Sequence, residues 1–141
     1  MSEISDSPTG WVAKHIRDYV ATDGRVGHRR WGVRTLLLTT RGRRTGQLRR
    51  TALIYGTDGD GRYVVVASNG GRPDNPAWYL NLLAHPEAHV QVGADRFTAA
   101  AAEATGEERE RLWTMMAELW PEYARYRAKT ARAIPVMLLR R

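Results

Sequence analysis

The chain has 141 residues, a formal net charge of +7 and no cysteine. This length fits one domain with a single core, and the lack of cysteine excludes a disulfide framework, a thiolate metal site and a cysteine nucleophile. The first ten residues are polar, and no apolar run approaches the roughly 20 residues of a membrane span. We therefore expect a cytoplasmic protein without a signal peptide.

The first predicted element is a helix that Ser7-Pro8-Thr9 caps and that runs to about Ala21. Two apolar stripes follow helical spacing along it: Val12, Ile16 and Val20, and beside them Trp11, His15 and Tyr19. So wide an apolar face favours packing on the core, and it leaves open a loose contact with a membrane surface or a cover over a pocket. We expect residues 1–22 to form this N-terminal helix and residues 23–141 to form one domain.

Strands dominate the middle of the chain. They are predicted at about 33–40, 50–57, 62–68, 88–92, 95–104 and 134–139, with a short helix from Pro76 to about Ala84. The Asp-Gly pairs at 58–61 predict a hairpin turn, because such a pair accommodates positive φ. Val64-Val65-Val66 is a continuous apolar run and predicts a strand that is buried on both faces.

Two helical segments are predicted before the last strand. Thr105 and Glu108 have the spacing of a capping box at the start of the first. Its apolar positions are Leu112, Trp113, Met116 and Leu119. Pro121 begins the second, with Tyr123 and Tyr126 one turn apart.

These elements define an α+β fold. Few connections are long enough for parallel crossovers, so the strands are expected to be mostly antiparallel. Six or so such strands with helices at the periphery predict a small β-barrel. Closure of the barrel would also remove the exposed edges of these apolar strands.

A basic turn between two apolar strands is the first candidate site. Arg43-Arg44-Thr45-Gly46 follows the segment 35–40 and precedes the segment 52–55. Guanidinium groups bind phosphate oxygens two at a time, so this turn predicts a phosphate site. A second turn of small residues, 67–71, opens toward the aromatic segment 75–79. Together they predict a pocket for an anionic, aromatic ligand.

The net charge and the histidines admit other interpretations. The many arginines are explained equally by attraction of an anion and by the codon usage of a GC-rich genome. Nucleic-acid binding also predicts a basic chain, but only Trp31 lies within the basic stretch to stack on bases. His85 and His89 are four residues apart, but Pro86 breaks a helix between them, so we expect no metal site. Asp74 is the only carboxylate near the predicted pocket, which disfavours hydrolysis by paired carboxylates.

Five blocks of sequence resemble those of the deazaflavin (coenzyme F420)-dependent nitroreductase family. In chain order they are Thr40-x-Gly-Arg-Arg-Thr-Gly-Gln, Val66-Ala-Ser-Asn-Gly-Gly, Asn75-Pro-Ala-Trp-Tyr-Leu-Asn-Leu, Trp120-Pro-Glu-Tyr and Thr130-Ala-Arg-Ala-Ile-Pro-Val. The resemblance extends from about Leu36 to Leu139. It implies a split β-barrel similar to the FMN-binding split barrels, with residues 23–141 as the deazaflavin-binding domain.

The resemblance also implies where coenzyme F420 binds. The basic turn and the next strand would hold its phosphate and polyglutamate tail, and the small-residue turn and the helix start would contact its ring and linker. The implied cofactor residues are Arg43, Arg44, Thr45, Arg49, Arg50, Thr51, Ala52, Leu53, Ile54, Val66, Ala67, Ser68, Asn69, Ala77, Trp78, Tyr79, Leu80 and Asn81. Trp78 and Tyr79 also suit packing in the core.

The substrate side follows from the same resemblance. Tyr123 matches a tyrosine implicated in catalysis, and Trp120 and Tyr126 would form walls of the substrate pocket. A phenol has a reference pKa of about 10, so neutral Tyr123 could donate a hydrogen bond to a developing anion. The family often has lysine where Asn69 stands and an aromatic hydroxyl where Trp120 stands. These departures widen the expected acceptors from nitro compounds to quinones and enones.

The function implied is hydride transfer from reduced deazaflavin to a small activated acceptor. Three alternatives stay open: an FMN-binding split-barrel oxidoreductase, a non-catalytic basic nucleic-acid-binding protein, and a barrel that binds a lipid. We expect no nucleic-acid partner and at most peripheral contact with a membrane. The residues leave the oligomeric state open.

Overall fold

A computed structural model describes residues 4–8 and 10–141 of the chain. The strands are β1 (Ile4–Asp6), β2 (Arg29–Arg30), β3 (Val33–Arg41), β4 (Leu48–Ile54), β5 (Gly56–Thr57), β6 (Tyr63–Val66), β7 (Glu87–Val92), β8 (Asp95–Glu103) and β9 (Val136–Arg140). The helices are α1 (Gly10–Ala21), the short 3-10 helix η1 (Asn69–Gly71), α2 (Ala77–Ala84), α3 (Gly106–Leu119) and α4 (Glu122–Lys129). The predicted α+β class and the six predicted strand regions are confirmed.

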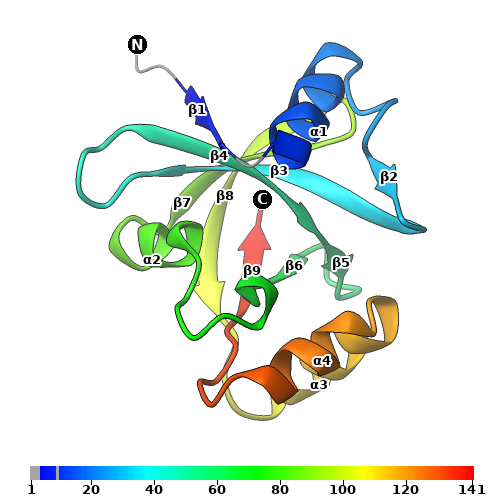
Figure 1. Ribbon diagram of the computed structural model, residues 1–141, viewed down its shortest axis with the longest axis vertical. Helices are drawn as coiled ribbons and strands as arrows, with labels where there is room; N and C mark the ends of the chain where they lie inside the picture. The colour runs from blue at the N-terminus through cyan, green and yellow to red at the C-terminus, as the bar shows by residue number, and fades with distance from the viewer. Residues whose placement is uncertain (1–3, 9) are drawn as a thin grey trace.

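Within the described residues the strands form one strongly curved sheet (Figure 1). Its order is β1-β4-β3-β7-β8-β9-β6-β5, and β2 adds to β3. All pairs are antiparallel except β1 with β4. Helix α1 lies at one end of the sheet, whereas α3 and α4 lie at the other (Figure 1).

The prediction that the barrel closes is wrong, because no hydrogen-bonded ladder joins the two ends of the described sheet. The edge of β4 away from β3 pairs with β1 over Leu48–Arg50. Only Tyr55 separates β4 from β5, and β5 pairs with β6. The chain itself therefore spans the opening, and the barrel is split rather than closed.

The strand β6 is buried on both faces, as its valine run predicts. Val65 packs inside the curved sheet with Leu36, Leu38 and residues of α2. Val64 and Val66 face the opposite way and pack under α3 and α4. The sheet therefore separates two apolar layers, and α3 and α4 cover the outer one.

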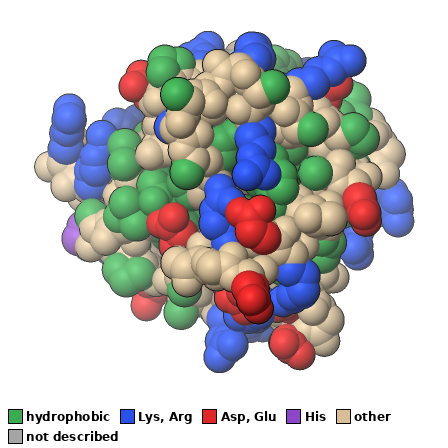
Figure 2. Space-filling model, turned by 90° about the horizontal axis from the view of Figure 1, so that it is seen from below, with side chains coloured by type: hydrophobic (Ala, Val, Ile, Leu, Met, Phe, Trp, Pro, Cys, Tyr) green, Lys and Arg blue, Asp and Glu red, His purple; other side chains and the backbone are tan. Residues whose placement is uncertain are grey.

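Seen from below, the molecule shows acidic and basic side chains interspersed among apolar ones (Figure 2).

Helix α1 packs on the outside of β3, where Ile16 and Tyr19 are fully buried against Leu37. His15 is also buried, but Trp11 is 53% exposed, so only part of the second predicted stripe reaches the core. The predicted cap of this helix includes Thr9, which lies outside the described residues. No helix in the described ranges is both long enough and apolar enough to cross a bilayer.

The predicted capping box at the start of α3 is wrong. The side chain of Thr105 makes no capping hydrogen bond, and the helix begins at Gly106 with a φ of +59°. The Glu108 carboxylate instead accepts a hydrogen bond from Arg62 at 3.0 Å, and Arg62 also pairs with Asp58. The capping box does not form because the Glu108 carboxylate bonds the charged guanidinium of Arg62, which attracts it more strongly than a backbone N–H does.

Candidate active site

The turn between β3 and β4 holds the basic residues at the end of the longest ladder in the described sheet. The Gly42 N–H donates to the Gln47 carbonyl at 2.8 Å, and the Gly46 N–H donates to the Gly42 carbonyl at 2.8 Å. These bonds fold residues 43–45 into an exposed tip. Arg43, Arg44 and Thr45 are therefore carried into solvent by a turn of defined shape.

Asn81 of α2 joins this turn to the body of the protein. Its side chain is only 3% exposed. Its Oδ1 accepts from the Arg43 backbone N–H at 3.1 Å and from Arg43 Nη1 at 3.5 Å. Its Nδ2 donates to Thr40 Oγ1 at 3.1 Å. One buried amide thus fixes the turn relative to α2.

A cavity of about 450 Å³ lies between this turn, α2 and the N-terminal strand. Its lining comprises Ser5, Asp6, Ser7, Pro8, Thr40, Gly42, Arg43, Arg44, Thr45, Arg49, Arg50, Thr51, Ala77, Trp78 and Asn81. Nine of the predicted cofactor residues are in this set. Four of the nine are arginines, so the cavity is strongly basic.

The other predicted cofactor residues lie outside the lining of this cavity. Ala52 packs toward α1, Leu53 and Leu80 pack on the inner apolar layer, and Ile54 packs on the outer one. Val66 and Ala67 are buried, and Ser68 and Asn69 form the segment around η1. Alternation along a strand explains part of this division, because neighbouring side chains of β4 point to opposite faces.

Trp78 and Tyr79 both belong to the inner apolar layer, and Trp78 also lines the cavity. The Tyr79 hydroxyl donates to Glu103 on β8. Burial, together with this carboxylate, raises the pKa of Tyr79 to about 12. Of the two aromatic residues at the start of α2, only Trp78 faces the space where a ligand would bind.

The strand β1 brings a carboxylate into the cavity, which the sequence did not predict. Arg50 Nε donates to Asp6 Oδ1 at 2.7 Å and Arg50 Nη2 donates to Asp6 Oδ2 at 3.2 Å. Arg50 is thus engaged in a bidentate pair that holds β1 on β4. Arg44 and Arg49 make no ion pair with the residues that the structure describes, so they are available to an anion.

The small-residue segment after β6 is organised by Arg132, another residue that the sequence did not single out. Its guanidinium donates to the carbonyl oxygens of Ser68 at 2.8 Å, Ala67 at 3.3 Å and Arg72 at 3.0 Å. It also donates to Asn75 Oδ1 at 2.8 Å. No local pattern predicts such contacts, although Arg132 lies within the last block of the resemblance.

Asn69 adopts a φ of +49°, and its side-chain Nδ2 donates to the Asp74 carbonyl at 2.9 Å. Its amide therefore stabilises the loop. Gly71 lies against α4: a Cβ at this position would be 3.0 Å from both the Cα and the carbonyl oxygen of Tyr126. This close approach joins the segment to the helix that carries the predicted substrate residues. In Figure 1 the segment runs between α2 and α4.

Tyr123 lies in the outer apolar layer and is 5% exposed. Its ring lies 6.2 Å from those of Trp113 and Tyr126. Burial raises the pKa of Tyr123 well above its usual range, so the phenol is neutral. No hydrogen bond joins its hydroxyl to residues 4–8 and 10–141, and because no buried side-chain oxygen among these residues lacks a partner, the hydroxyl oxygen is not fully enclosed.

Trp120 packs partly on the same layer and contacts Trp31 of the β2–β3 turn, with ring centroids 6.0 Å apart. Neither Trp120 nor the two tyrosines line the basic cavity. The structure therefore separates the predicted residues into a basic group at the β3–β4 turn and an aromatic group at α4. The segment around η1 connects the two.

The split antiparallel barrel and the arginine-rich cavity at a strand turn agree with the split-barrel class that the sequence resemblance implies. Within this class, residues 11–141 match the family described as F420H(2)-dependent quinone reductase. An F420H(2)-dependent quinone reductase of Mycobacterium tuberculosis is 43% identical over 144 residues, which cover 93% of this chain and 96% of that protein. The chain therefore belongs to the F420H(2)-dependent quinone reductase family.

Solved structures agree with this assignment. An F420-H2 dependent reductase superposes with a TM-score of 0.68 at 40% identity, over 74% of this chain and 92% of that chain. A pyridoxamine 5'-phosphate oxidase-related, FMN-binding protein of Nostoc punctiforme gives a TM-score of 0.52 at 14% identity, over 95% of this chain and 80% of that chain, and shares the fold alone. The predicted split barrel and the predicted F420-dependent family are confirmed, under the name of quinone rather than nitro reductases.

Proposed function

We propose that this protein is an F420-dependent oxidoreductase that reduces a quinone, and that nitro compounds and enones are further acceptors. The observation that carries the proposal is the basic cavity at the β3–β4 turn, in a chain of this family. Several separate guanidinium groups suit a ligand with several anionic groups better than a ligand with one phosphate.

The donors present fit coenzyme F420. Arg43, Arg44 and Arg49 offer guanidinium groups to its phosphate and polyglutamate tail. Ala77 and Trp78 are the first residues of α2 and line the same cavity. The first N–H groups of a helix have no partner within the helix, so they add donors for an anion. When bound, the cofactor supplies two electrons as a hydride.

Residues of the chain then position the ligand and provide a proton. Asn81 holds the basic turn on α2, and Arg132 holds the segment 67–75 that lies between the cavity and α4. A quinone that accepts a hydride also needs a proton donor at its oxygen. Neutral Tyr123 can donate a hydrogen bond to that oxygen as negative charge develops on it, which supports its role as the catalytic residue. Trp120 and Tyr126 flank it as walls of the acceptor pocket.

An FMN-dependent split-barrel enzyme is the second candidate, because an FMN-binding protein shares the fold. The two candidates differ in the number of anionic groups that the basic turn must bind. Replacement of Arg44 or Arg49 by alanine is expected to weaken binding of F420 strongly, and to affect a ligand with one phosphate less.

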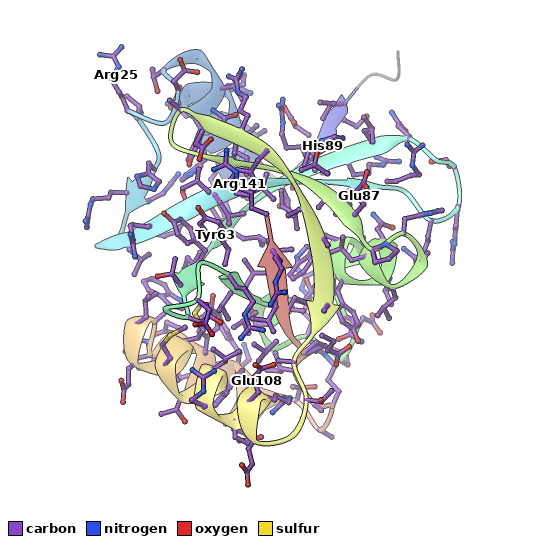
Figure 3. All side chains as sticks on the ribbon, turned by 180° about the vertical axis from the view of Figure 1, so that it is seen from behind. Arg25, Tyr63, Glu87, His89, Glu108 and Arg141 are labelled. Atoms are coloured by element: carbon purple, nitrogen blue, oxygen red, sulfur yellow. The ribbon has the colours of Figure 1, made fainter. Side chains whose placement is uncertain are left out.

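The test is anaerobic reduction of menadione by the purified protein with reduced F420, followed through the absorbance of the oxidised cofactor. Tyr123→Phe should lower kcat about a hundredfold and leave the unfolding temperature unchanged, because the hydroxyl is not fully enclosed and its removal breaks no hydrogen bond within the described residues. Tyr63→Phe removes a hydroxyl from β6 (labelled in Figure 3), where the ring packs on the inner apolar layer and not on the layer of Tyr123, and it should leave kcat unchanged. Turnover with reduced FMN but not with reduced F420 would contradict the proposal.

A further inference from the structure

The turn between β2 and β3 holds a tryptophan in an unfavourable backbone conformation. Arg30 pairs with Val33, so Trp31 and Gly32 are the two residues of the hairpin loop. Both have positive φ, +52° at Trp31 and +77° at Gly32. Such loops favour Asn, Asp or Gly at the first of these positions, and a bulky residue there is strained.

Core packing does not explain this strain. The Trp31 side chain remains 53% exposed, so about half of its surface still contacts water. The indole is nevertheless held firmly: its centroid lies 5.5 Å from that of Trp11 and 6.0 Å from that of Trp120. Strain retained at an exposed aromatic residue indicates a function for its position.

The guanidinium of Arg30 stacks on the indole ring of Trp31. Its Cζ lies 4.5 Å from the centroid of Trp31 and 5.3 Å from that of Trp11. Arg30 Nη1 lies 2.9 Å from His15 Nδ1, to which it can only donate. His15 is buried, and its Nε2 lies 3.1 Å from Thr35 Oγ1. The Thr35 hydroxyl donates to a backbone carbonyl, so His15 must donate to it from Nε2. These bonds fix the guanidinium and therefore the indole.

Arg25, an arginine between α1 and β2, is not held against aromatic rings as Arg30 is. Arg25 points away from the sheet into solvent (Figure 3). Of these two arginines, Arg30 is the one that places its charge beside the rings of Trp11 and Trp31. A fixed positive charge at that place favours a bound ring that carries carbonyl oxygens with partial negative charge.

The aromatic surface continues from Trp31 to the predicted acceptor residues. Trp120 contacts Trp31, and the Trp120 carbonyl accepts from the Tyr123 N–H at 3.1 Å. Tyr123 in turn contacts Tyr126. A planar ring that binds against Trp120, a predicted wall of the acceptor pocket, would therefore meet the indole of Trp31.

We propose that Trp31 is a specificity-determining residue that forms the outer wall of the acceptor site and stacks on planar, conjugated, uncharged acceptors such as a naphthoquinone. This inference rests on the proposed function, and it adds a residue from the β2–β3 turn to the acceptor site. Arg30 is the positioning residue that holds the indole in place.

The test compares Trp31→Asn with the wild-type protein by calorimetric titration of menadione, with and without bound F420. Asparagine tolerates positive φ, so the unfolding temperature should stay the same or rise. Menadione affinity should fall about five- to tenfold, F420 affinity should stay unchanged, and the effect on turnover should be on KM rather than kcat. Val26→Asn is the matched control, since Val26 is 52% exposed in the same connection and should leave all these values unchanged.

The outcomes separate this inference from the proposed function. If menadione binds Trp31→Asn as tightly as it binds the wild-type protein, the inference is wrong, even when the wild-type protein reduces menadione with F420. The inference is also wrong if menadione does not bind the wild-type protein. Binding of menadione without turnover from F420 contradicts the proposed function alone. If Trp31→Asn proves unstable, Trp31→Phe retains a ring: affinity near that of the wild type supports the inference, and the full loss contradicts it.

Discussion

Replacement of Asn81 by alanine should separate the basic turn from α2. Asn81 is 3% exposed and makes two good hydrogen bonds, with the Arg43 backbone N–H and with Thr40 Oγ1, each at 3.1 Å. Thr40 is 1% exposed, so its hydroxyl would lose its partner in a buried place. At about 1 kcal/mol for each bond and a similar penalty for the unpaired group, we expect a loss of about 2–3 kcal/mol in the free energy of unfolding.

The expected loss corresponds to a fall of about 6–9 °C in the unfolding temperature of a domain of this size. F420 affinity should fall about tenfold or more, because the turn that carries Arg43 and Arg44 would no longer be fixed. Differential scanning calorimetry measures the first quantity. Fluorescence titration with F420 measures the second.

Asn81→Asp should separate the two effects. The carboxylate can still accept from Arg43, and the Thr40 hydroxyl can rotate to donate to it, so stability should change by less than about 1 kcal/mol. The new negative charge lies in the cavity, and it should weaken an anionic ligand by about 1 kcal/mol or more, or about fivefold.

The matched control is Asn75→Asp. Asn75 also accepts a hydrogen bond from an arginine, Arg132, but it does not line the cavity. The same change of charge there should affect F420 affinity less than Asn81→Asp does. Wild-type F420 affinity in Asn81→Asp would refute the reasoning, because the basic turn would then not be where the anionic part of the ligand binds.

Three further predictions concern other parts of the site and core. Asp6→Asn removes the only carboxylate among the described residues that line the basic cavity, and titration should show F420 binding about fivefold tighter; weaker binding would mean that the ligand needs an intact β1. Gly71→Ala should lower the free energy of unfolding by about 2 kcal/mol in urea titrations, because φ is +80° and the new Cβ would be 3.0 Å from the Tyr126 backbone; an unchanged midpoint would contradict that close packing. Burial lowers the pKa of His15 and His28, so the unfolded chain binds more protons below its histidine pKa of about 6.5. Stability should be constant just above that pH and fall below it, and replacement of both histidines by glutamine should flatten the profile.

Local patterns in the sequence predicted the strands and α2 well. The valine run of β6 and the Asp-Gly turn after β5 are local signals, and both features are present in the structure. The start of α2 after Pro76 follows from the same kind of signal. These elements depend on interactions between residues close in the chain, which a sequence pattern can express.

The pairings that the sequence did not predict join distant parts of the chain. Strand β1 has only three residues, and Asp6 holds it to Arg50 across 44 positions. Strand β2 ends in a turn where Trp31 replaces the usual Asn or Gly, so the ordinary hairpin signal is missing. The contacts of Arg132 with backbone carbonyls also carry no sequence signature. The predicted closure of the barrel is wrong because β1 occupies part of the edge of β4.

The predicted site residues also divide into those that the structure brings together and those that it does not. Family resemblance selected the basic turn and the helix start, and the structure gathers nine of those residues around one cavity. Resemblance does not say which way a side chain points, so Tyr79 and Ala52 were included although they pack in apolar layers. The roles of Tyr123, Trp120 and Tyr126 stay predictions. The division into an N-terminal helix, residues 1–22, and a domain, residues 23–141, is also a prediction.

The most direct measurement is an equilibrium fluorescence titration of the purified wild-type protein with coenzyme F420, with FMN titrated in parallel. The account predicts micromolar or tighter binding of F420, a clear preference over FMN, and loss of that preference when Arg44 and Arg49 are both replaced by alanine. Equal or tighter binding of FMN, or F420 binding that the double replacement leaves unchanged, would contradict the assignment of the basic cavity as the F420 site.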